Sequence, residues 1–189
     1  RVIRACRVRT PLRRRLSYGD RPVPAGRRPS RKIFRSGVAL GMCNAYEQHV
    51  KWVEYCKMMQ ALELGIPTQQ SELDLPESDD VRINDMAPVM RAAGNSIELV
   101  SMNFSFPPSG RKGGPVFNFR SEGRNFANSN RCLIPASAFF EFTGKKYPKA
   151  KHRFTLANAP FMAIAGLWRD GQGNQPPSFT MLTTEPGPD

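Results

Sequence analysis

Three groups of residues in this 189-residue chain could carry chemistry, and the first is centred on Cys43. Cys43 follows Met42, at the end of a basic stretch rich in Pro and Gly. If translation starts at Met42, removal of that methionine leaves Cys43 with a free amine (pKa about 7.7–8.0) and a thiol (pKa about 8.5) on neighbouring carbons. Such an aminothiol condenses with an aldehyde to an imine, and the thiol then closes a thiazolidine ring. The alternative is a buried structural cysteine beside a helix N-terminus.

The second group is the stretch FNFRSEGR at 117–124. Asn118, Arg120 and Glu122 alternate along it, so in an extended segment they share one face, with phenylalanines on the other. Arginine suits bidentate phosphate contacts, and asparagine can orient an amine or a carbonyl by hydrogen bonds. The pattern fits a solvated strand edge and a binding site equally well.

The third group is Glu141 within AFFEF. A carboxylate among phenylalanines in a strand is costly to bury, and such surroundings raise its pKa toward neutrality, where it can donate and accept protons. Alternation could instead point Glu141 to solvent. Because Phe139 shares its face, however, that face is not simply polar, and the functional interpretation is favoured.

Charge is distributed unevenly along the chain. The formal net charge is +12, but residues 1–42 hold 13 Lys and Arg and one acidic residue, so residues 43–189 carry 15 groups of each sign. Nucleic-acid binding by the globular part must therefore depend on local chemistry rather than on overall charge. No apolar run approaches the ~20 residues of a membrane span, so no membrane partner is expected.

The cysteines favour a reducing compartment. They show no C-x-x-C pair and no dense spacing, and no secretory signal precedes them, so free thiols in the cytoplasm are expected. Neither histidine has ligand spacing to a cysteine, so neither a metal site nor a cofactor is predicted. The residues concerned are Cys6, Cys43, Cys56, Cys132, His49 and His152.

Residues 1–42 are rich in Arg, Pro, Gly and Ser and lack sustained apolar periodicity, which predicts disorder. Three interpretations compete: a basic nucleic-acid-binding tail, an organellar presequence, and upstream sequence joined wrongly to a gene that begins at Met42. The third is favoured, because the chain opens on Arg1. The extension is thus expected not to belong to the native protein, which leaves 43–189 as the domain.

From Cys43 onward the pattern is that of a folded protein. Apolar residues recur every three or four positions, which predicts a helix over about 46–64. An acidic, turn-rich loop is expected at 67–81, followed by strands. The predicted class is α+β, with a mainly antiparallel, strongly curved sheet and flanking helices. The predicted strands are 96–104, 132–142, 153–158, 161–168 and 178–184.

Taken in order, these motifs resemble one family. Met-Cys followed by Asn and an aromatic, then N-x-R-x-E, RCLIPASAFFEF, a Lys-rich turn, FMAIAGLW and SFTMLTT are together similar to the SRAP family, the SOS response-associated peptidases or abasic-site processing proteins. The resemblance covers about 43–189. It implies an SRAP-like, barrel-like fold and a monomer that senses abasic sites in single-stranded DNA and forms a covalent thiazolidine crosslink.

The resemblance also implies roles for particular residues. Cys43 would be the nucleophile and the attachment point, and Asn118 would hold its amine and the sugar. Arg120 would grip a flanking phosphate, and Glu141 would shuttle protons. Pro88 would be an apolar loop residue that wedges against the DNA at the lesion.

The chain also departs from the family pattern. The family usually has a histidine after the segment that matches SFTMLTT, and neither histidine of this chain matches it, so the resemblance implies that the C-terminal part of the domain is missing. Asn44-Ala45 stands where many members have Gly-Arg. A tryptophan-rich segment is replaced by MNFSFPPSGRKGG, with candidate base-stacking residues Phe104 and Phe106 and candidate phosphate contacts Arg111 and Lys112.

Two other functions stay open from the sequence. The chain could be a thiol autopeptidase that removes the residues before Cys43, in which case 1–42 is a propeptide. It could also be a non-catalytic nucleic-acid-binding protein that acts through the basic arm, and its binding would then depend steeply on salt.

Overall fold

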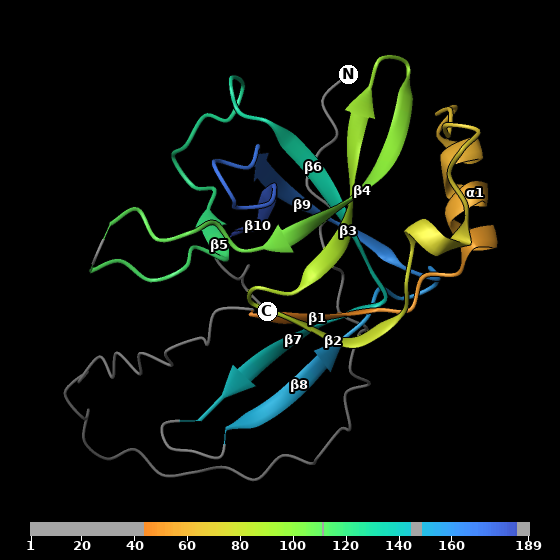
Figure 1. Cartoon of the computed structure of the whole chain (residues 1–189). Helices are drawn as coiled ribbons and strands as arrows, with labels where there is room; N and C mark the ends of the chain where they lie inside the picture. Colours follow the sequence, from red (N-terminus) through yellow and green to blue (C-terminus); the bar gives the residue numbers. More distant parts are fainter. Residues whose placement is uncertain (1–43, 111, 145–148, 185–189) are drawn as a thin grey trace, which may run out of the picture. The chain divides into compact units, whose positions relative to one another are not determined.

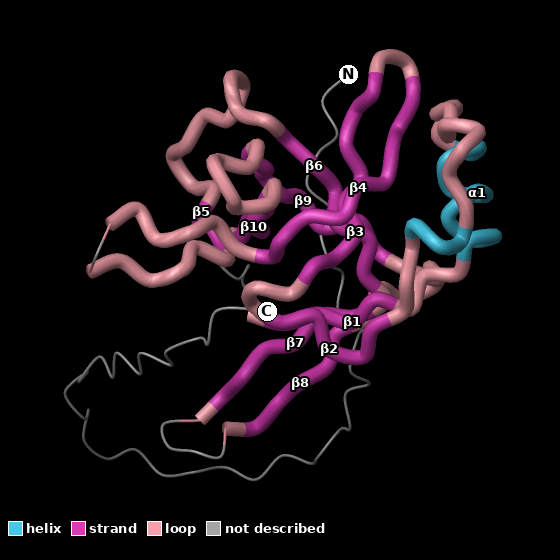
Figure 2. The backbone as a smooth tube through the Cα atoms, in the orientation of Figure 1, coloured by secondary structure: helices cyan, strands magenta, loops and turns pink. Residues whose placement is uncertain are grey.

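The computed structural model of the chain describes residues 44–110, 112–144 and 149–184. Strands dominate this part of the chain, with one α-helix and one 3-10 turn (Figure 1, Figure 2), which confirms the α+β class but leaves a single α-helix where several were expected. In chain order the elements are β1 (Ala45–Gln48), α1 (Trp52–Ala61), η1 (Glu72–Asp74), β2 (Ser78–Arg82), β3 (Met86–Ala93), β4 (Ser96–Phe104), β5 (Asn118–Arg120), β6 (Arg131–Ala136), β7 (Ala138–Thr143), β8 (Ala150–Phe154), β9 (Met162–Arg169) and β10 (Ser178–Thr183).

Five of the strands close into a barrel. β3 pairs with β4 and β6, β9 pairs with β6 and β10, and β10 returns to pair with β4. Only the β10–β4 contact in this ring is parallel. Because β10 pairs with β4 only through its first two residues, residues 181–183 are left to pair with the short strand β5. The barrel confirms the strongly curved, mainly antiparallel sheet expected from the sequence.

The remaining strands form a second, fully antiparallel sheet in the order β2-β1-β7-β8. β6 and β7 are separated only by Ser137, so the single strand predicted over 132–142 is divided between the two sheets. The hydroxyl of Ser137 donates to Oε1 of Glu47 (2.8 Å) and accepts from the N–H of His49 (3.1 Å). These bonds fix the corner at which the chain leaves the barrel.

Two apolar clusters hold the fold together. In the first, Phe104 lies edge-on to Tyr46 (ring centroids 5.6 Å apart) and stacks on Phe179 (5.2 Å), and all three side chains are fully buried. In the second, Tyr55 and Met59 of α1 pack on residues of the β3–β4 hairpin. Full burial of one such side chain contributes about 1.5–3 kcal/mol, so α1 is stabilised mainly by this packing.

The helix predicted over 46–64 is wrong at its start, where the chain forms β1. Tyr46 and Gln48 are fully buried, and β1 pairs with β2 on one side and β7 on the other. Strand pairing and burial therefore override the helical period of the local sequence. α1 begins only after β1, and Tyr55 and Met59 form its buried face, as the same period predicts.

The other strand predictions differ in accuracy. Those at 96–104, 161–168 and 178–184 are confirmed to within one residue at each end by β4, β9 and β10. The strand predicted at 153–158 lies earlier, as β8. The expected loop at 67–81 contains η1 and most of β2, an outer strand in which Asp79 faces solvent and Asp80 is half-buried. The sequence pattern missed β3 entirely.

An ion pair on the second sheet predicts a pH-dependent stability. Two nitrogens of the Arg153 guanidinium donate to the Glu47 carboxylate (2.6 and 2.8 Å), and these bonds lower the pKa of Glu47 to about 2. Because the folded pKa is depressed, the stabilisation is present above pH ~4.5 and is lost as the pH falls toward 2. Glu47→Gln is expected to lower the unfolding free energy by about 1 kcal/mol at pH 7, since half of Arg153 is solvated.

Urea unfolding at pH 7, 4 and 2.5 would measure this difference, which is expected to shrink as the pH falls. Glu77→Gln is the matched control, because Glu77 pairs with Lys51 at the solvent-exposed surface and is expected to change stability very little. A Glu47→Gln deficit that stays the same at all three pH values would contradict the ion-pair explanation.

Candidate active site

Glu141 lies in β7, as predicted, and is half-buried, with one carboxylate oxygen inaccessible to solvent. Its face of the sheet also carries Phe139, which stacks on Phe154 of β8 with ring centroids 5.1 Å apart. Directly opposite Glu141 in the β7–β8 pair is His152, whose Nε2 lies 2.7 Å from the hydroxyl of Thr143. The carboxylate is therefore bordered by an aromatic stack on one side and by a titratable ring on the other.

The register of β1 decides which part of the chain reaches this carboxylate. Tyr46 of β1 is opposite Phe139 of β7 in an antiparallel pair. The pairing ends at these residues; continued by two more, the same register would place Asn44 alongside Glu141. Cys43 lies outside the described residues, and it is bonded directly to Asn44. The fold thus directs the start of the domain to the strand that carries Glu141.

β5 carries the second group of predicted residues. Asn118 pairs with Met181 of β10 and is half-buried, whereas Arg120 pairs with Thr183 and is exposed. Phe117, just before the strand, packs on the same core cluster as Phe139. β5 and β7 therefore border one apolar cluster, which contains Tyr46 of β1.

Several other predicted contacts are placed differently from the expectation. Glu122 is exposed in the turn after β5, so it does not continue the face of Asn118 and Arg120. Lys112 is exposed in the loop that the Phe106–Val116 bridge closes, whereas Arg111 lies outside the described residues.

Pro88 is not a loop residue. It lies in β3 opposite Ser101 and is buried. A proline is tolerated there because β3 pairs with β6 only at Met90 and Leu133, so no ladder partner on that side needs the missing N–H. A buried strand residue is not placed to wedge between bases, and Pro88 is therefore left out of the DNA contacts proposed below.

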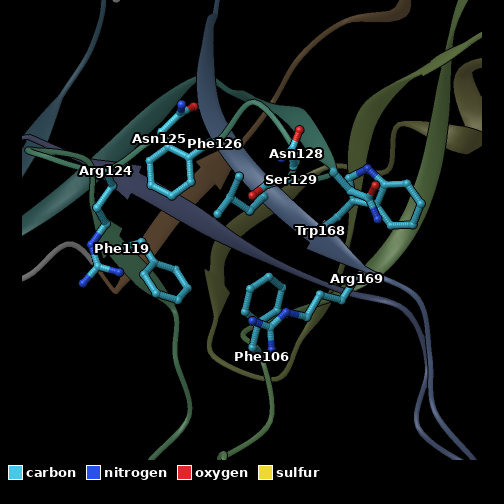
Figure 3. A pocket seen from close by; sticks show the side chains of 11 residues that line it. Phe106, Phe119, Arg124, Asn125, Phe126, Asn128, Ser129, Trp168 and Arg169 are labelled. Atoms are coloured by element: carbon cyan, nitrogen blue, oxygen red, sulfur yellow. The ribbon is translucent and has the colours of Figure 1, made fainter.

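The two candidate stacking rings have different surroundings. Phe104 is fully buried in the core cluster and cannot stack on a base. Phe106 is only 2% exposed, but its ring, with that of Phe119 on β5, lines a pocket of about 510 Å³ (Figure 3). The pocket is lined by Phe106, Phe119, Arg124, Asn125, Phe126, Asn128, Ser129, Asn130, Leu167, Trp168 and Arg169.

The two cysteines within the described residues, Cys56 and Cys132, both carry free thiols. Cys132 is buried in β6, and burial raises the pKa of its thiol to about 12, so it stays protonated and poorly nucleophilic at neutral pH. In the part of the chain that the structure describes, no group of three or more His, Cys, Asp or Glu residues is placed to bind a metal ion.

Alkylation is therefore expected to discriminate between these two cysteines. At pH 8, iodoacetamide should modify Cys56, which is half-buried on α1, about a hundredfold faster than Cys132. Peptide mass spectrometry after timed quenching would measure each site separately, and alkylation in denaturant gives the control in which both react. Equal rates in the folded protein would contradict the assignment of Cys132 as an inert core residue.

His152 is the site residue that the sequence analysis missed. It does not match the family's histidine in order along the chain, and only the register of the β7–β8 hairpin brings it opposite Glu141. The signal that could have located it is the Gly- and Lys-rich turn after AFFEF, which predicts that the strands on either side pair around it.

Comparisons with known proteins agree on the fold. Solved structures of a protein from Bordetella bronchiseptica (23% identical, TM-score 0.51), one from Bacteroides thetaiotaomicron (17%, 0.52) and a phage-related protein from Bordetella bronchiseptica (15%, 0.53) are similar to this chain. Each comparison covers 75% of this chain, and covers 72%, 68% and 69% of the respective structures. At these identities the likeness shows the fold alone. Comparison with curated protein sequences gives no match.

Within the described residues no helix is both long and apolar enough to span a membrane.

The family comparison is more specific. The family model described as "SOS response associated peptidase (SRAP)" matches residues 42–189, which is most of the chain and includes every element of the barrel and of the second sheet. The chain therefore belongs to the SRAP family, whose members are associated with the SOS response to DNA damage.

Proposed function

We propose that this protein captures abasic sites in single-stranded DNA by forming a thiazolidine through Cys43 as its N-terminal residue. The observation that carries the proposal is the antiparallel pairing of Tyr46 with Phe139 in β1 and β7. Continued by two residues, this register would place Asn44, the residue after Cys43, alongside the half-buried carboxylate of Glu141. Membership of a family associated with the SOS response supports DNA as the substrate.

The proposed chemistry is a condensation that releases one water. The α-amine of Cys43 attacks the aldehyde carbon of the ring-opened sugar and forms a carbinolamine, and loss of water gives an imine. The thiol sulfur then adds to the imine carbon and closes the ring. Glu141, when protonated, donates to the departing hydroxyl, which leaves the imine protonated on nitrogen; the resulting carboxylate then accepts the thiol proton as the sulfur adds, so Glu141 is protonated again and the nitrogen keeps its own proton.

The other residues position the substrate. Asn118, half-buried on β5, orients the amine and the sugar by hydrogen bonds. Arg120 is exposed on the same strand and binds a flanking phosphate through its guanidinium. Lys112, and Arg111 beside it in the sequence, add phosphate contacts from the loop before β5. Such contacts fix the position of the DNA, and the covalent bond makes its capture lasting.

A second candidate function is favoured by the description of the family itself. The matching family is named for a peptidase, so we also propose a thiol autopeptidase activity that removes residues preceding Cys43. Both activities need the same thiol. They differ in their product, because the peptidase shortens its own chain and needs no DNA.

One experiment tests both functions. A chain that begins at Met42 and the full 189-residue chain are each incubated with a single-stranded oligonucleotide that carries one abasic site, and are run on a denaturing gel beside their Cys43→Ala variants. A heat-stable shifted band is expected from the shorter chain and is expected to be absent with Cys43→Ala. Intact-mass measurement without DNA tests whether the full chain shortens itself.

The outcomes separate the proposals. A shift from the full chain only after it has lost residues 1–42 would support both functions. A shift only from the chain that begins at Met42 would support crosslinking and contradict self-processing. No shifted band from any folded protein would overturn the crosslinking proposal and leave the mass measurement to decide on the peptidase.

A further inference from the structure

The geometry points to a binding site for one unpaired base of single-stranded DNA in the pocket behind β5, which we call the β5 pocket. The inference rests on the proposed function for its ligand class and extends it with a second contact outside the reaction site. Six of the residues that line the β5 pocket supply its aromatic surface, its positive charge and an amide group (Figure 3). They are Phe106, Phe119, Arg124, Phe126, Asn128 and Arg169.

Aromatic rings supply the apolar surface of the β5 pocket. Phe106 and Phe119 lie edge to face with centroids 6.2 Å apart, and Phe126 adds a third ring from the loop between β5 and β6 (Figure 3). Phe126 is half-buried in a loop that is otherwise mostly polar. Phe119 and Phe126 are half-buried and can stack on a base, whereas the buried ring of Phe106 contacts Phe119 and supports it. Stacking of this kind accepts any base, because every base has a π-face.

Two guanidinium groups give the pocket a positive charge, which suits the phosphate of a nucleotide. Arg124 lies over the ring of Phe119, 5.5 Å from its centroid, and Arg169 lies over Phe106 at 4.3 Å. The described residues that line the pocket include these two arginines and no carboxylate. A neutral or anionic aromatic ligand therefore fits the pocket better than a cationic one, and a nucleotide supplies both the ring and the phosphate.

The loop between β5 and β6 forms one wall of the β5 pocket, and hydrogen bonds hold this loop in place. The side-chain oxygen of Asn125 accepts from the N–H of Ala127 (2.9 Å), and the carbonyl of Phe126 accepts from the N–H of Ser129 (3.1 Å). The carbonyl of Asn130 accepts from the N–H of Trp168 (3.0 Å), which ties the loop to β9. The wall is thus preformed, and binding does not need to order it.

Size and polar groups also suit a nucleobase. A volume of about 510 Å³ is within the range of about 300–1,000 Å³ that small-molecule sites occupy. The exposed side chain of Asn128 lines the pocket and offers both amide donors and an acceptor, as the edge of a base requires.

The position of the β5 pocket relates it to the proposed reaction site. Phe119 stands between Asn118 and Arg120 in the three-residue strand β5, and in a strand successive side chains point to opposite faces. A strand of DNA held by Arg120 on one face of β5 therefore has a neighbouring nucleotide within reach of the pocket on the other. The pocket would hold a base that flanks the lesion, not the abasic sugar.

Photocrosslinking to undamaged DNA tests this inference without using Cys43. The full chain is irradiated with an oligothymidylate of about eight nucleotides in which one thymine is replaced by 5-iodouracil, a probe that reacts with stacked aromatic residues. After trypsin digestion, the labelled peptide is expected to be 125–131, which contains Phe126, or 113–120, which contains Phe119. Label on residues 1–42 is mapped separately and does not interfere.

Variants make the test quantitative. Phe126→Ala removes the ring in peptide 125–131, so the label is measured in peptide 113–120. At subsaturating DNA this label is expected to fall about tenfold, the loss expected for one stacked base. Arg124→Ala is expected to lower it severalfold. The matched controls are Leu73→Ala, an apolar side chain 86% exposed in η1, and Lys57→Ala, an exposed cation on α1, and neither should change the label.

The results separate this inference from the proposed function. Label within residues 43–189 that falls only outside the two pocket peptides, or label in those peptides that Phe126→Ala leaves unchanged in a folded protein, would overturn the pocket assignment even if Cys43 forms its crosslink. Label in the pocket together with no abasic-site crosslink would keep the pocket as a DNA-binding site and overturn the chemistry proposed for Cys43.

Discussion

Glu141→Gln is expected to slow thiazolidine formation by about a hundredfold or more at neutral pH, the effect typical of losing a positioned proton donor and acceptor. Glutamine has nearly the shape of glutamate and can still accept a hydrogen bond, but it cannot deliver a proton to the departing hydroxyl or remove one from the thiol. The final crosslink is expected to be the same, because the covalent product does not contain Glu141. The effect should therefore be a loss of rate rather than of yield.

A single-turnover time course measures this rate, with the protein in excess over an abasic oligonucleotide and samples quenched into denaturant. Glu122→Gln is the matched control, because it makes the same chemical change in the exposed turn after β5. Thermal unfolding of each variant would establish that it is folded. A Glu141→Gln rate within about twofold of the wild type would overturn the proton-transfer role and leave Cys43 to react without this residue.

The pH dependence of the two proteins gives a second readout. The α-amine of Cys43 must be deprotonated to attack, and Glu141 must be protonated to donate to the departing hydroxyl, so the wild-type rate should follow a bell-shaped profile and Glu141→Gln should lose its high-pH limb. His152 lies opposite Glu141, so a limb that persists in Glu141→Gln and disappears in His152→Ala would assign that limb to the imidazole. A merely structural role for Glu141 would change neither limb.

The sequence was sufficient where local pattern and burial agree. SIELVSMNF reads as a strand because its apolar and β-branched residues suit a half-buried sheet, and β4 spans those nine residues. AFFEF was expected to be a strand with Glu141 within it, and β7 confirms this. In both cases the residue types within the strand itself were enough to predict the strand, and these can be read directly from the sequence.

The sequence was insufficient where distant segments decide the structure. Tyr46 fits a helical period, yet it is taken into β1 by pairing with β2 and β7, which come from residues 78–82 and 138–143. Pro88 argues locally against a central strand, and only the sparse β3–β6 pairing shows why β3 accepts it. Such outcomes depend on contacts that no local pattern contains.

The same limit applies to the candidate sites. Glu141 and the N-x-R-x-E motif have recognisable residue types, but the closeness of His152 to Glu141 follows from the hairpin register. The β5 pocket combines Phe106, the loop after β5 and the end of β9, which are separated in the sequence. No spacing rule joins these three segments, so the pocket became visible only in the folded chain.

Gly166→Ala is expected to destabilise the protein by about 3 kcal/mol, at the upper end of the cost of overpacking a core. Gly166 lies in β9, inside the barrel wall between β6 and β10. A methyl group on its Cα would lie 2.8 Å from the carbonyl oxygen of Thr180, 3.0 Å from Sγ of Cys132 and 3.1 Å from Cδ1 of Ile134. The nearest of these atoms is backbone, so the strands themselves must move apart.

Thermal and urea unfolding would measure the loss, which corresponds to a fall in Tm of about 6–12 °C for a domain of this size. Gly110→Ala is the matched control, because no atom lies within 4 Å of the added methyl group and the change should be nearly neutral. Cys132→Ala in the Gly166→Ala background removes one of the three close contacts and leaves the one to the backbone, so it should restore only part of the stability. Full recovery would show that the sulfur alone sets the cost, whereas a neutral Gly166→Ala would contradict the close packing of β9 against β10 that closes the barrel.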